Sequence, residues 1–232
     1  MGGQDGAGPS GPARPWRDGP VPVMRPHALA LPIPLPYPPE LPAGLRGRPR
    51  VLQLVDTDAI SHGLVDGTPR ERASNQEVRA CLELVRATAA AVDPQSRIVC
   101  AASSATATHH LDVMTASGGN TFVIRRGIDG ADQALLEELR HLTAVHLAAH
   151  RPRRRRPADP ADLVILVAQD HIFAPAIRQL RLLGVPTWLF VPGQRVAAEL
   201  YTAACAVTSI GPLPGRLNTG GTGRRPSGRK ND

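Results

Sequence analysis

Short, fully apolar runs alternate with stretches of helical periodicity between residues 50 and 210. The clearest example covers residues 162–191, where the apolar run LVILV is followed by apolar positions at helical spacing, a glycine at position 184 and a second apolar run. Apolar runs of this length favour strands that are covered on both faces, and the periodic segment that stops at a glycine favours a helix. This stretch is therefore predicted to form one β-α-β unit.

The same alternation repeats along the rest of this region. Helices are predicted at residues 74–92, 103–118, 130–150, 172–183 and 193–201, and strands at 50–56, 97–102, 121–125, 163–167, 187–191 and 206–210. Strands that alternate with helices are typical of a parallel sheet between two helical layers. We therefore predict an α/β fold over residues 49–212, a Rossmann-like three-layer sandwich with a mostly parallel sheet of five to six strands.

The two ends of the chain have a different composition. Residues 1–48 carry Pro or Gly too often for a packed element, and residues 213–232 are Gly-rich and basic. Both are predicted to be disordered extensions. The segment ALALPIPLPYPPELP in the first of them favours polyproline conformations, which makes it a candidate docking segment for a protein partner.

Charge and composition restrict the class of protein. The formal net charge of +7 and the pI near 10.5 agree with a polyanionic partner, and equally with a general enrichment in arginine. The 3% aromatic content argues against binding of single strands mainly by base stacking. The three cysteines show no CxxC spacing and are expected to be reduced, and no apolar run reaches the length of a membrane helix. We expect a soluble, cytoplasmic protein that does not bind membranes.

Acidic residues follow the predicted strands. Asp56 and Asp58 come directly after the first strand, Asp170 follows the strand at 163–167, and Asp132 lies in the first turn of the helix at 130–150, with Glu138 further along that helix. Asp56 and Asp58 have an ordinary explanation as turn caps, and Asp132 as a helix-dipole partner. Together they lie at the carboxyl edge of a parallel sheet, where ligands bind, and Mg²⁺ and Mn²⁺ prefer such oxygen ligands.

Arginines are the second candidate set. Residues 151–162, RPRRRRPADPAD, are predicted to be an exposed loop, which is either a solvated insert or a contact for a phosphate backbone beside the acidic edge. Two more arginines follow the third predicted strand. The candidate nucleic-acid-binding residues are Arg125, Arg126, Arg153, Arg154, Arg155 and Arg156.

Other nucleotide and metal motifs are lacking in the sequence. No G-x-G-x-x-G follows the first predicted strand and no G-x-x-x-x-G-K-[ST] is present, which disfavours dinucleotide and P-loop sites. The neighbouring His109 and His110 point in different directions on a helix, so they do not chelate one metal together.

Three segments resemble the NYN domains of the PIN-like ribonuclease superfamily. VLQLVDTDAI is similar to the family's opening strand with D-x-D-N, GADQALLEEL to its K-G-x-D-x-x-L-x-x-D helix, and VAQDHIFAPAIRQLRLLGVPTWLF to its S-G-D-x-D-F-x-P signature. The resemblance covers residues 51–211. The chain departs from the family at four positions: Ala59 stands for Asn, Ala168 and Gln169 for Ser-Gly, and Ile172 for the second Asp of the signature.

The resemblance implies a metal-dependent endoribonuclease that uses Mg²⁺ or Mn²⁺. Asp56, Asp132 and Asp170 stand at the positions of the family's catalytic acids, Asp58 matches the second acid of the opening motif, and Glu138 stands where the family commonly has Asp. The alternative is a catalytically degenerate NYN domain that acts as an RNA-binding or protein-interaction module, since the polar residues that orient metal ligands have been replaced. RNA is the expected partner in both cases, and a homodimer is a candidate assembly.

Overall fold

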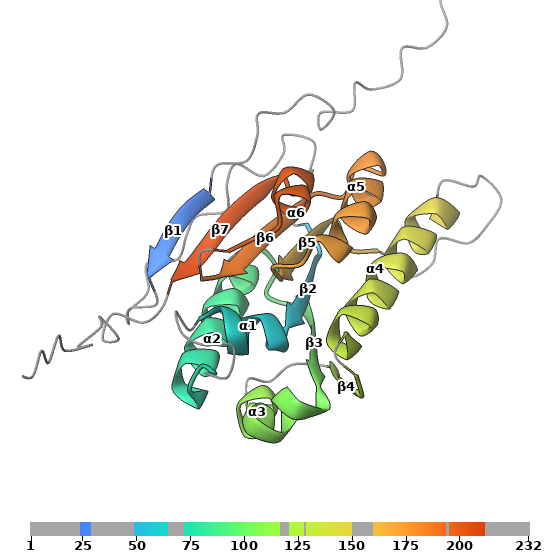
Figure 1. Cartoon of the computed structure of the whole chain (residues 1–232). Coiled ribbons are helices and arrows are strands. Elements are labelled where there is room, and N and C mark those ends of the chain that lie inside the picture. Colours follow the sequence, from blue (N-terminus) through green and yellow to red (C-terminus); the bar gives the residue numbers. More distant parts are fainter. Residues whose placement is uncertain are drawn as a thin grey trace, which may run out of the picture.

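The computed structural model describes residues 24–28, 49–64, 72–116, 121–127, 129–149, 160–193 and 195–211. Seven strands and six α-helices occur in these ranges, together with a short 3₁₀ turn, η1 (His171–Phe173), and they are shown in Figure 1. The strands are β1 (Met24–Ala28), β2 (Val51–Asp56), β3 (Arg97–Ser103), β4 (Thr121–Arg125), β5 (Leu163–Val167), β6 (Thr187–Pro192) and β7 (Ala206–Gly211). The helices are α1 (Thr57–Gly63), α2 (Asn75–Val92), α3 (Ser104–Ala116), α4 (Gly130–Ala149), α5 (Ala174–Leu182) and α6 (Ala198–Ala203).

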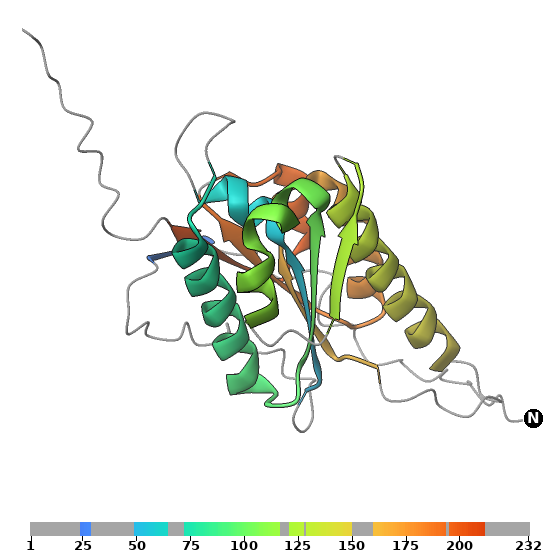
Figure 2. The same cartoon turned by 90° about the horizontal axis from the view of Figure 1, so that it is seen from below.

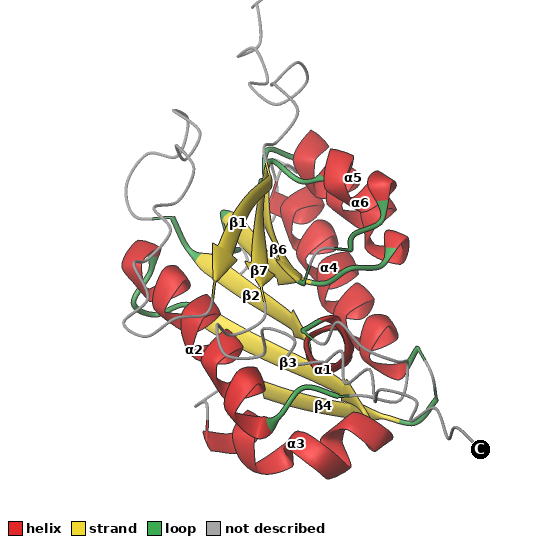
Figure 3. Ribbon diagram, turned by 60° about the vertical axis from the view of Figure 1, so that its left-hand side comes forward, coloured by secondary structure: helices red, strands yellow, loops and turns green. Residues whose placement is uncertain are grey.

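The strands form a single sheet in the order β1-β7-β6-β5-β2-β3-β4, and every neighbouring pair is parallel. The sheet is visible in Figure 3, with β2 and β3 crossing its middle. Without β1, this order is that of a Rossmann sheet, with β2 and β5 side by side where the direction of winding reverses. The predicted α/β three-layer fold is therefore confirmed, with six strands in the predicted domain and β1 as a seventh.

Two apolar layers hold the sandwich together, one on each face of the sheet. One packs Val55 and Trp188 of the sheet against α2 and α3, and the other packs Leu54 and Leu166 against α4 and α5. Figure 2 shows α2 and α3 on one side of the sheet and α4 on the other. Successive strand residues point to opposite faces, so strands covered on both sides are apolar throughout, which explains the runs seen in the sequence.

Three parts of the prediction need correction or extension. The segment 57–63, expected to end the first strand as a turn, forms helix α1, because Asp56 accepts hydrogen bonds from the N–H groups of Asp58 and Ala59 and so caps the helix. Helix α6 begins at Ala198, five residues after the predicted start at residue 193. Strand β1 lies within residues 1–48, predicted to be an extension without packed elements, and pairs with β7. The rest of that extension and residues 213–232 lie outside the described residues.

A buried histidine connects three of the helices. His110 of α3 is 2% exposed; its Nε2 lies 3.1 Å from Ser61 Oγ of α1, and its Nδ1 lies 2.6 Å from Asn75 Oδ1 of α2. Burial lowers the pKa of His110, and the nearby His109, Arg72 and His62 lower it further. Since Ser61 is fully buried, this Ser-His-Asn arrangement is structural: it joins α1, α2 and α3.

We expect replacement of His110 by glutamine to flatten the acid limb of the stability curve. The imidazole has a folded pKa below its ordinary value of 6.5, so it favours the folded state above pH 6.5, and this contribution is lost as the pH falls towards the folded pKa. Melting temperatures of both proteins at pH 7.5 and pH 5.5 measure the effect. Parallel pH profiles would show that His110 does not set the acid limb.

Candidate functional site

Four of the five predicted acidic residues, Asp56, Asp58, Asp132 and Asp170, lie at the carboxyl edge of the sheet. Asp56 is the last residue of β2, and Asp170 follows β5, the strand next to β2. The N-terminal turn of α4, which carries Asp132, begins after β4 and opens on the same edge. The crevice between two strands where the winding reverses is the usual ligand site of such sheets, so these residues occupy the position where the fold places chemistry.

Asp56 is the most deeply placed of these carboxyls. Its side chain is 5% exposed, and its Oδ1 accepts hydrogen bonds from the N–H of Asp58 at 2.9 Å and of Ala59 at 3.1 Å. Burial raises the pKa of Asp56 well above its ordinary value, and the nearby Asp132 and Asp58 raise it further, against the lowering effect of the two N–H donors. Its negative charge is therefore costly unless a cation offsets it.

Asp132 interacts with four other acids, Asp56, Asp58, Asp129 and Asp170. Burial raises its pKa to about 6, repulsion from Asp170, Asp129 and Asp58 adds to this, and a side-chain hydrogen bond with Asp56 opposes it. Asp129, three residues earlier and immediately before α4, was not a predicted site residue. It adds a second negative charge at this end of the helix.

Asp58 faces the end of β3. Its two carboxylate oxygens accept hydrogen bonds from the N–H of Ser103, each at 3.1 Å, and Oδ1 also accepts one from the Ser103 hydroxyl at 3.1 Å. Ser103 was not a predicted site residue. These bonds hold the Asp58 carboxylate at the start of α3, so its contribution to the site is its charge, which raises the pKa of both Asp56 and Asp132.

Asp170 lies on the solvent-exposed side of the acidic group, and its side chain is 51% exposed. Its Oδ1 accepts a hydrogen bond from the N–H of Ile172 at 3.1 Å and lies 2.7 Å from Nδ1 of His171. The buried Asp56 and the exposed Asp170 thus lie on the inner and outer sides of the acidic group. Asp132 interacts with both of them.

The prediction that Glu138 belongs to the metal site is wrong. Helix α4 runs from the carboxyl edge towards the amino edge of the sheet, and six residues advance it by about 9 Å from Asp132. Glu138 pairs there with Arg97, the first residue of β3, at the opposite edge from the ends of β2 and β5. Glu138 therefore lies beside Arg97 at the amino edge and does not belong to the acidic group at the carboxyl edge.

The predicted basic residues are only partly described. Arg125, at the end of β4, forms a bidentate ion pair with Glu137 of α4, in which Nη1 donates to Oε1 at 2.8 Å. Arg126 follows on the exposed turn beyond β4. Both lie at the carboxyl edge, with Arg125 already held by a carboxylate. Arg153, Arg154, Arg155 and Arg156 lie outside the described residues.

Gln169, the residue before Asp170, connects β5 to the end of β6. Its side-chain amide donates to the Pro192 carbonyl at the end of β6, and its own carbonyl accepts from Ala197 N–H at 3.0 Å. Gly63 packs against Gln169 and Pro192 so closely that a Cβ on Gly63 would lie 2.5 Å from the Gln169 amide nitrogen. This tight packing fixes the backbone immediately before Asp170.

The donor chemistry of the acidic group fits a hard divalent cation. Carboxylate oxygens are the ligands that Mg²⁺ and Mn²⁺ prefer. Burial first, and neighbouring carboxylates second, raise the pKa values of Asp56 and Asp132, and a cation would relieve both effects. In the described part of the chain, no group of three or more His, Cys, Asp or Glu side chains is arranged as a closed set of metal ligands. Binding would therefore require the Asp170 side chain to turn towards Asp56 and Asp132, which already share a hydrogen bond.

No protein-family model and no curated protein matches this sequence. One solved structure with a similar fold is a crystal structure of a protein of unknown function from Vibrio parahaemolyticus, with a TM-score of 0.43 and 13% identity, covering 70% of this chain and 93% of that chain. The chemistry of the site therefore rests on the residues of this chain.

Proposed function

We propose that this protein is a metal-dependent ribonuclease that hydrolyses RNA phosphodiester bonds at the acidic site, as the resemblance to NYN domains implies. The observation that carries the proposal is the gathering of Asp56, Asp132 and Asp170 at the reversal of the sheet, where burial, together with repulsion from neighbouring acids, raises the pKa of Asp132 to about 6. A group of acids that destabilise one another is poorly explained by folding alone, because such charges favour the unfolded chain.

The residues have different roles in this proposal. Asp56, Asp132 and Asp170 would hold Mg²⁺ or Mn²⁺, which supplies activation of water and neutralises charge on the phosphate. Asp56 is oriented by the N-terminus of α1 and defines the floor of the site. Asp170 and His171 are the exposed members, so they would meet the RNA strand, with Nδ1 of His171 held by Asp170 and the rest of its ring free to face a phosphate oxygen.

A binding module without catalysis is the second candidate, and specific contacts favour it. Gln169 uses its side chain to bind Pro192 instead of orienting a metal ligand, and Asp170 is already paired with His171. The loss of residues that orient metal ligands typically lowers affinity or activity by roughly 10- to 100-fold. In this case RNA would bind through the basic residues at the carboxyl edge without being cut.

Among the residues that the structure describes, no helix has the length and apolar character needed to cross a membrane.

Cleavage of labelled RNA, single-stranded and structured, in Mg²⁺, Mn²⁺ or a chelator tests the proposal. We expect cleavage in Mn²⁺ that the chelator stops, and a loss of at least about 100-fold in Asp170→Asn, which keeps the shape of the side chain but removes the charge that a cation needs. The variant, purified in the same way, also controls for contaminating nucleases. Equal cleavage by both proteins would reject the catalytic role, and salt-dependent RNA binding without cleavage would favour the binding module.

A further inference from the structure

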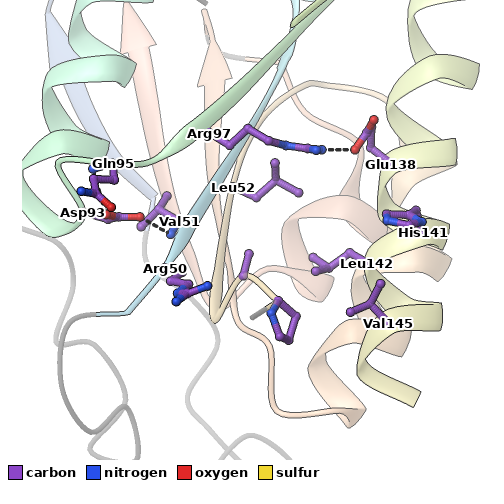
Figure 4. Close-up of a pocket in the computed structure, with 12 residues that line it drawn as sticks. Arg50, Val51, Leu52, Asp93, Gln95, Arg97, Glu138, His141, Leu142 and Val145 are labelled. Carbon is purple, nitrogen blue, oxygen red and sulfur yellow. Dashed lines mark hydrogen bonds and ion pairs between the residues drawn. The ribbon is translucent and has the colours of Figure 1, made fainter. Parts of the chain in front are cut away.

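A pocket of about 400 Å³ lies at the amino edge of the sheet, at the opposite end of β2 and β3 from the acidic residues. It is bounded by the beginnings of these strands, the second half of α4 and the residues just before β5, as Figure 4 shows. Small-molecule sites typically occupy about 300–1,000 Å³ and combine apolar walls with a few polar groups. The pocket has the size and the mixed lining of such a site.

Its walls are apolar and firmly held. Leu52 and Leu142 are 5% and 6% exposed and stand on the sheet and helix sides, with Val145 beside Leu142 on α4. The segment at Ala161 is fixed by a hydrogen bond between its carbonyl and Nε2 of His146, 2.9 Å long. The following residue is fixed as well, because Asp162 N–H donates to the Arg50 carbonyl at 2.8 Å. The pocket is therefore formed without any ligand.

One end of the pocket carries Arg97 and Glu138 in contact, while Arg50 and Asp93 line another part of it. Arg97 pairs with Glu138, and their side chains are 50% and 27% exposed, so both keep solvent-facing donors and acceptors. Figure 4 shows the pair above Leu52, with His141 on the same side of α4 as Glu138. His141 is three residues after Glu138, which places both on one helix face. A ligand entering here meets a guanidinium beside a carboxylate, which share one contact between Nη2 and Oε2.

We propose that this pocket binds a guanine base, from a free nucleotide or from an RNA strand. Guanine presents two neighbouring acceptors, N7 and O6, which suit a guanidinium, and next to them two donors, N1–H and the N2 amino group, which suit a carboxylate. Its flat ring fits against the apolar walls of Leu52, Leu142 and Val145. Adenine presents an amino donor beside N7 and has no hydrogen on N1, so it opposes both members of the pair.

Calorimetric titration with guanosine monophosphate (GMP) and adenosine monophosphate (AMP), without divalent cations, tests the proposal independently of ribonuclease activity. We expect saturable binding of GMP, at least about tenfold tighter than AMP, which is the discrimination that one bidentate contact to a guanine edge provides. Arg97→Gln and Glu138→Gln should each remove that preference. Backbone amide resonances of Leu52 and Arg97 should shift on addition of GMP.

Glu137→Gln is the matched control. Glu137 is the neighbour of Glu138 on α4 but pairs with Arg125 at the other edge, so this variant should bind GMP like the wild type. The exposed Arg97–Glu138 pair contributes little to stability, so the pocket variants should remain folded. Two short RNAs, one with guanine and one with adenine, show whether the base comes from a free nucleotide or from RNA. Tighter binding of the guanine-containing RNA than of GMP assigns the pocket to RNA. Equal binding of GMP and AMP, or no binding of GMP or the guanine strand, overturns the proposal.

Discussion

Replacing Asp132 by asparagine will raise the melting temperature at pH 8 while reducing Mn²⁺-dependent RNA cleavage by about 100-fold or more. The folded pKa of Asp132 is about 6, above its ordinary value of 3.8, so its ionised form destabilises the folded protein above pH 6. Asparagine removes this penalty. Because Asp132 is half-exposed and partly screened, we expect a gain of ~1 kcal/mol, which corresponds to roughly 2–4 °C in a domain of this size.

The difference in melting temperature between the wild type and Asp132→Asn should depend on pH. As the pH falls through 6, the wild-type carboxyl takes up a proton and the penalty fades, so the two melting temperatures should converge towards pH 4. Mn²⁺ should raise the melting temperature of the wild type, by an amount that corresponds to about 2.7 kcal/mol at 100 times the dissociation constant. In Asp132→Asn this shift should be lost or greatly reduced.

Asp112→Asn is the control for removing a negative charge. Asp112 is exposed on α3 and does not contribute to the repulsion on Asp56 or Asp132, so its replacement should change neither the melting temperature at pH 8 nor the response to Mn²⁺. A lower melting temperature for Asp132→Asn, or an unchanged Mn²⁺ shift, would show that the acids at this edge do not form a cation site.

Gly193→Ala is expected to destabilise the fold by about 2–5 kcal/mol. Gly193 has φ of +75°, which costs an alanine roughly 1–2 kcal/mol, and a Cβ at this position would lie 2.1 Å from the carbonyl oxygen of Gly63. Since that neighbour is backbone, α1 and the end of β6 would have to separate, and forced overpacking adds about 1–3 kcal/mol. Chemical denaturation measures the loss.

Gly184→Ala separates the two causes. Gly184 has a similar φ of +83°, but a Cβ there meets nothing within 4 Å, so this variant should lose only the backbone contribution. The difference between the two variants then measures the contact between Gly63 and Gly193. Equal losses would mean that the contact relaxes without cost. Because Gly63 also packs on Gln169, the residue before Asp170, Gly193→Ala should lower cleavage more than Gly184→Ala does.

The sequence predicted the sheet well because most of its strands are covered on both faces. The bounds of β4 and β5 were predicted to the residue, and β5 is an unbroken apolar run between two helical layers. Helix α1 was missed because one residue, Asp56, both ends a strand and caps a helix, so no turn residue separates the two elements. Strand β1 was missed because a proline lies within it, which favours an edge strand or no strand.

The candidate site was predictable as far as topology determines it. Parallel strands bring their carboxyl ends to one edge, so acids after β2 and β5 were expected to meet. Asp132 interacts with both Asp56 and Asp170, while the metal site itself stays a prediction. Glu138 was assigned wrongly because a motif does not show how far along a helix a side chain lies. The pocket at the amino edge was not predicted, since its residues come from four distant segments that share no motif.

The central position of β2 has a consequence for synthesis of the protein. Its residues Val51 to Val55 pair with Leu163 to Val167 of β5, so more than a hundred residues are made between the two partners. When only β2, β3 and β4 have emerged from the ribosome, the edge of β2 that later pairs with β5 is exposed. Contacts between residues this far apart in the sequence form slowly. Asp56 and Asp170 therefore meet only in the last third of translation, so the site proposed above would form late in synthesis.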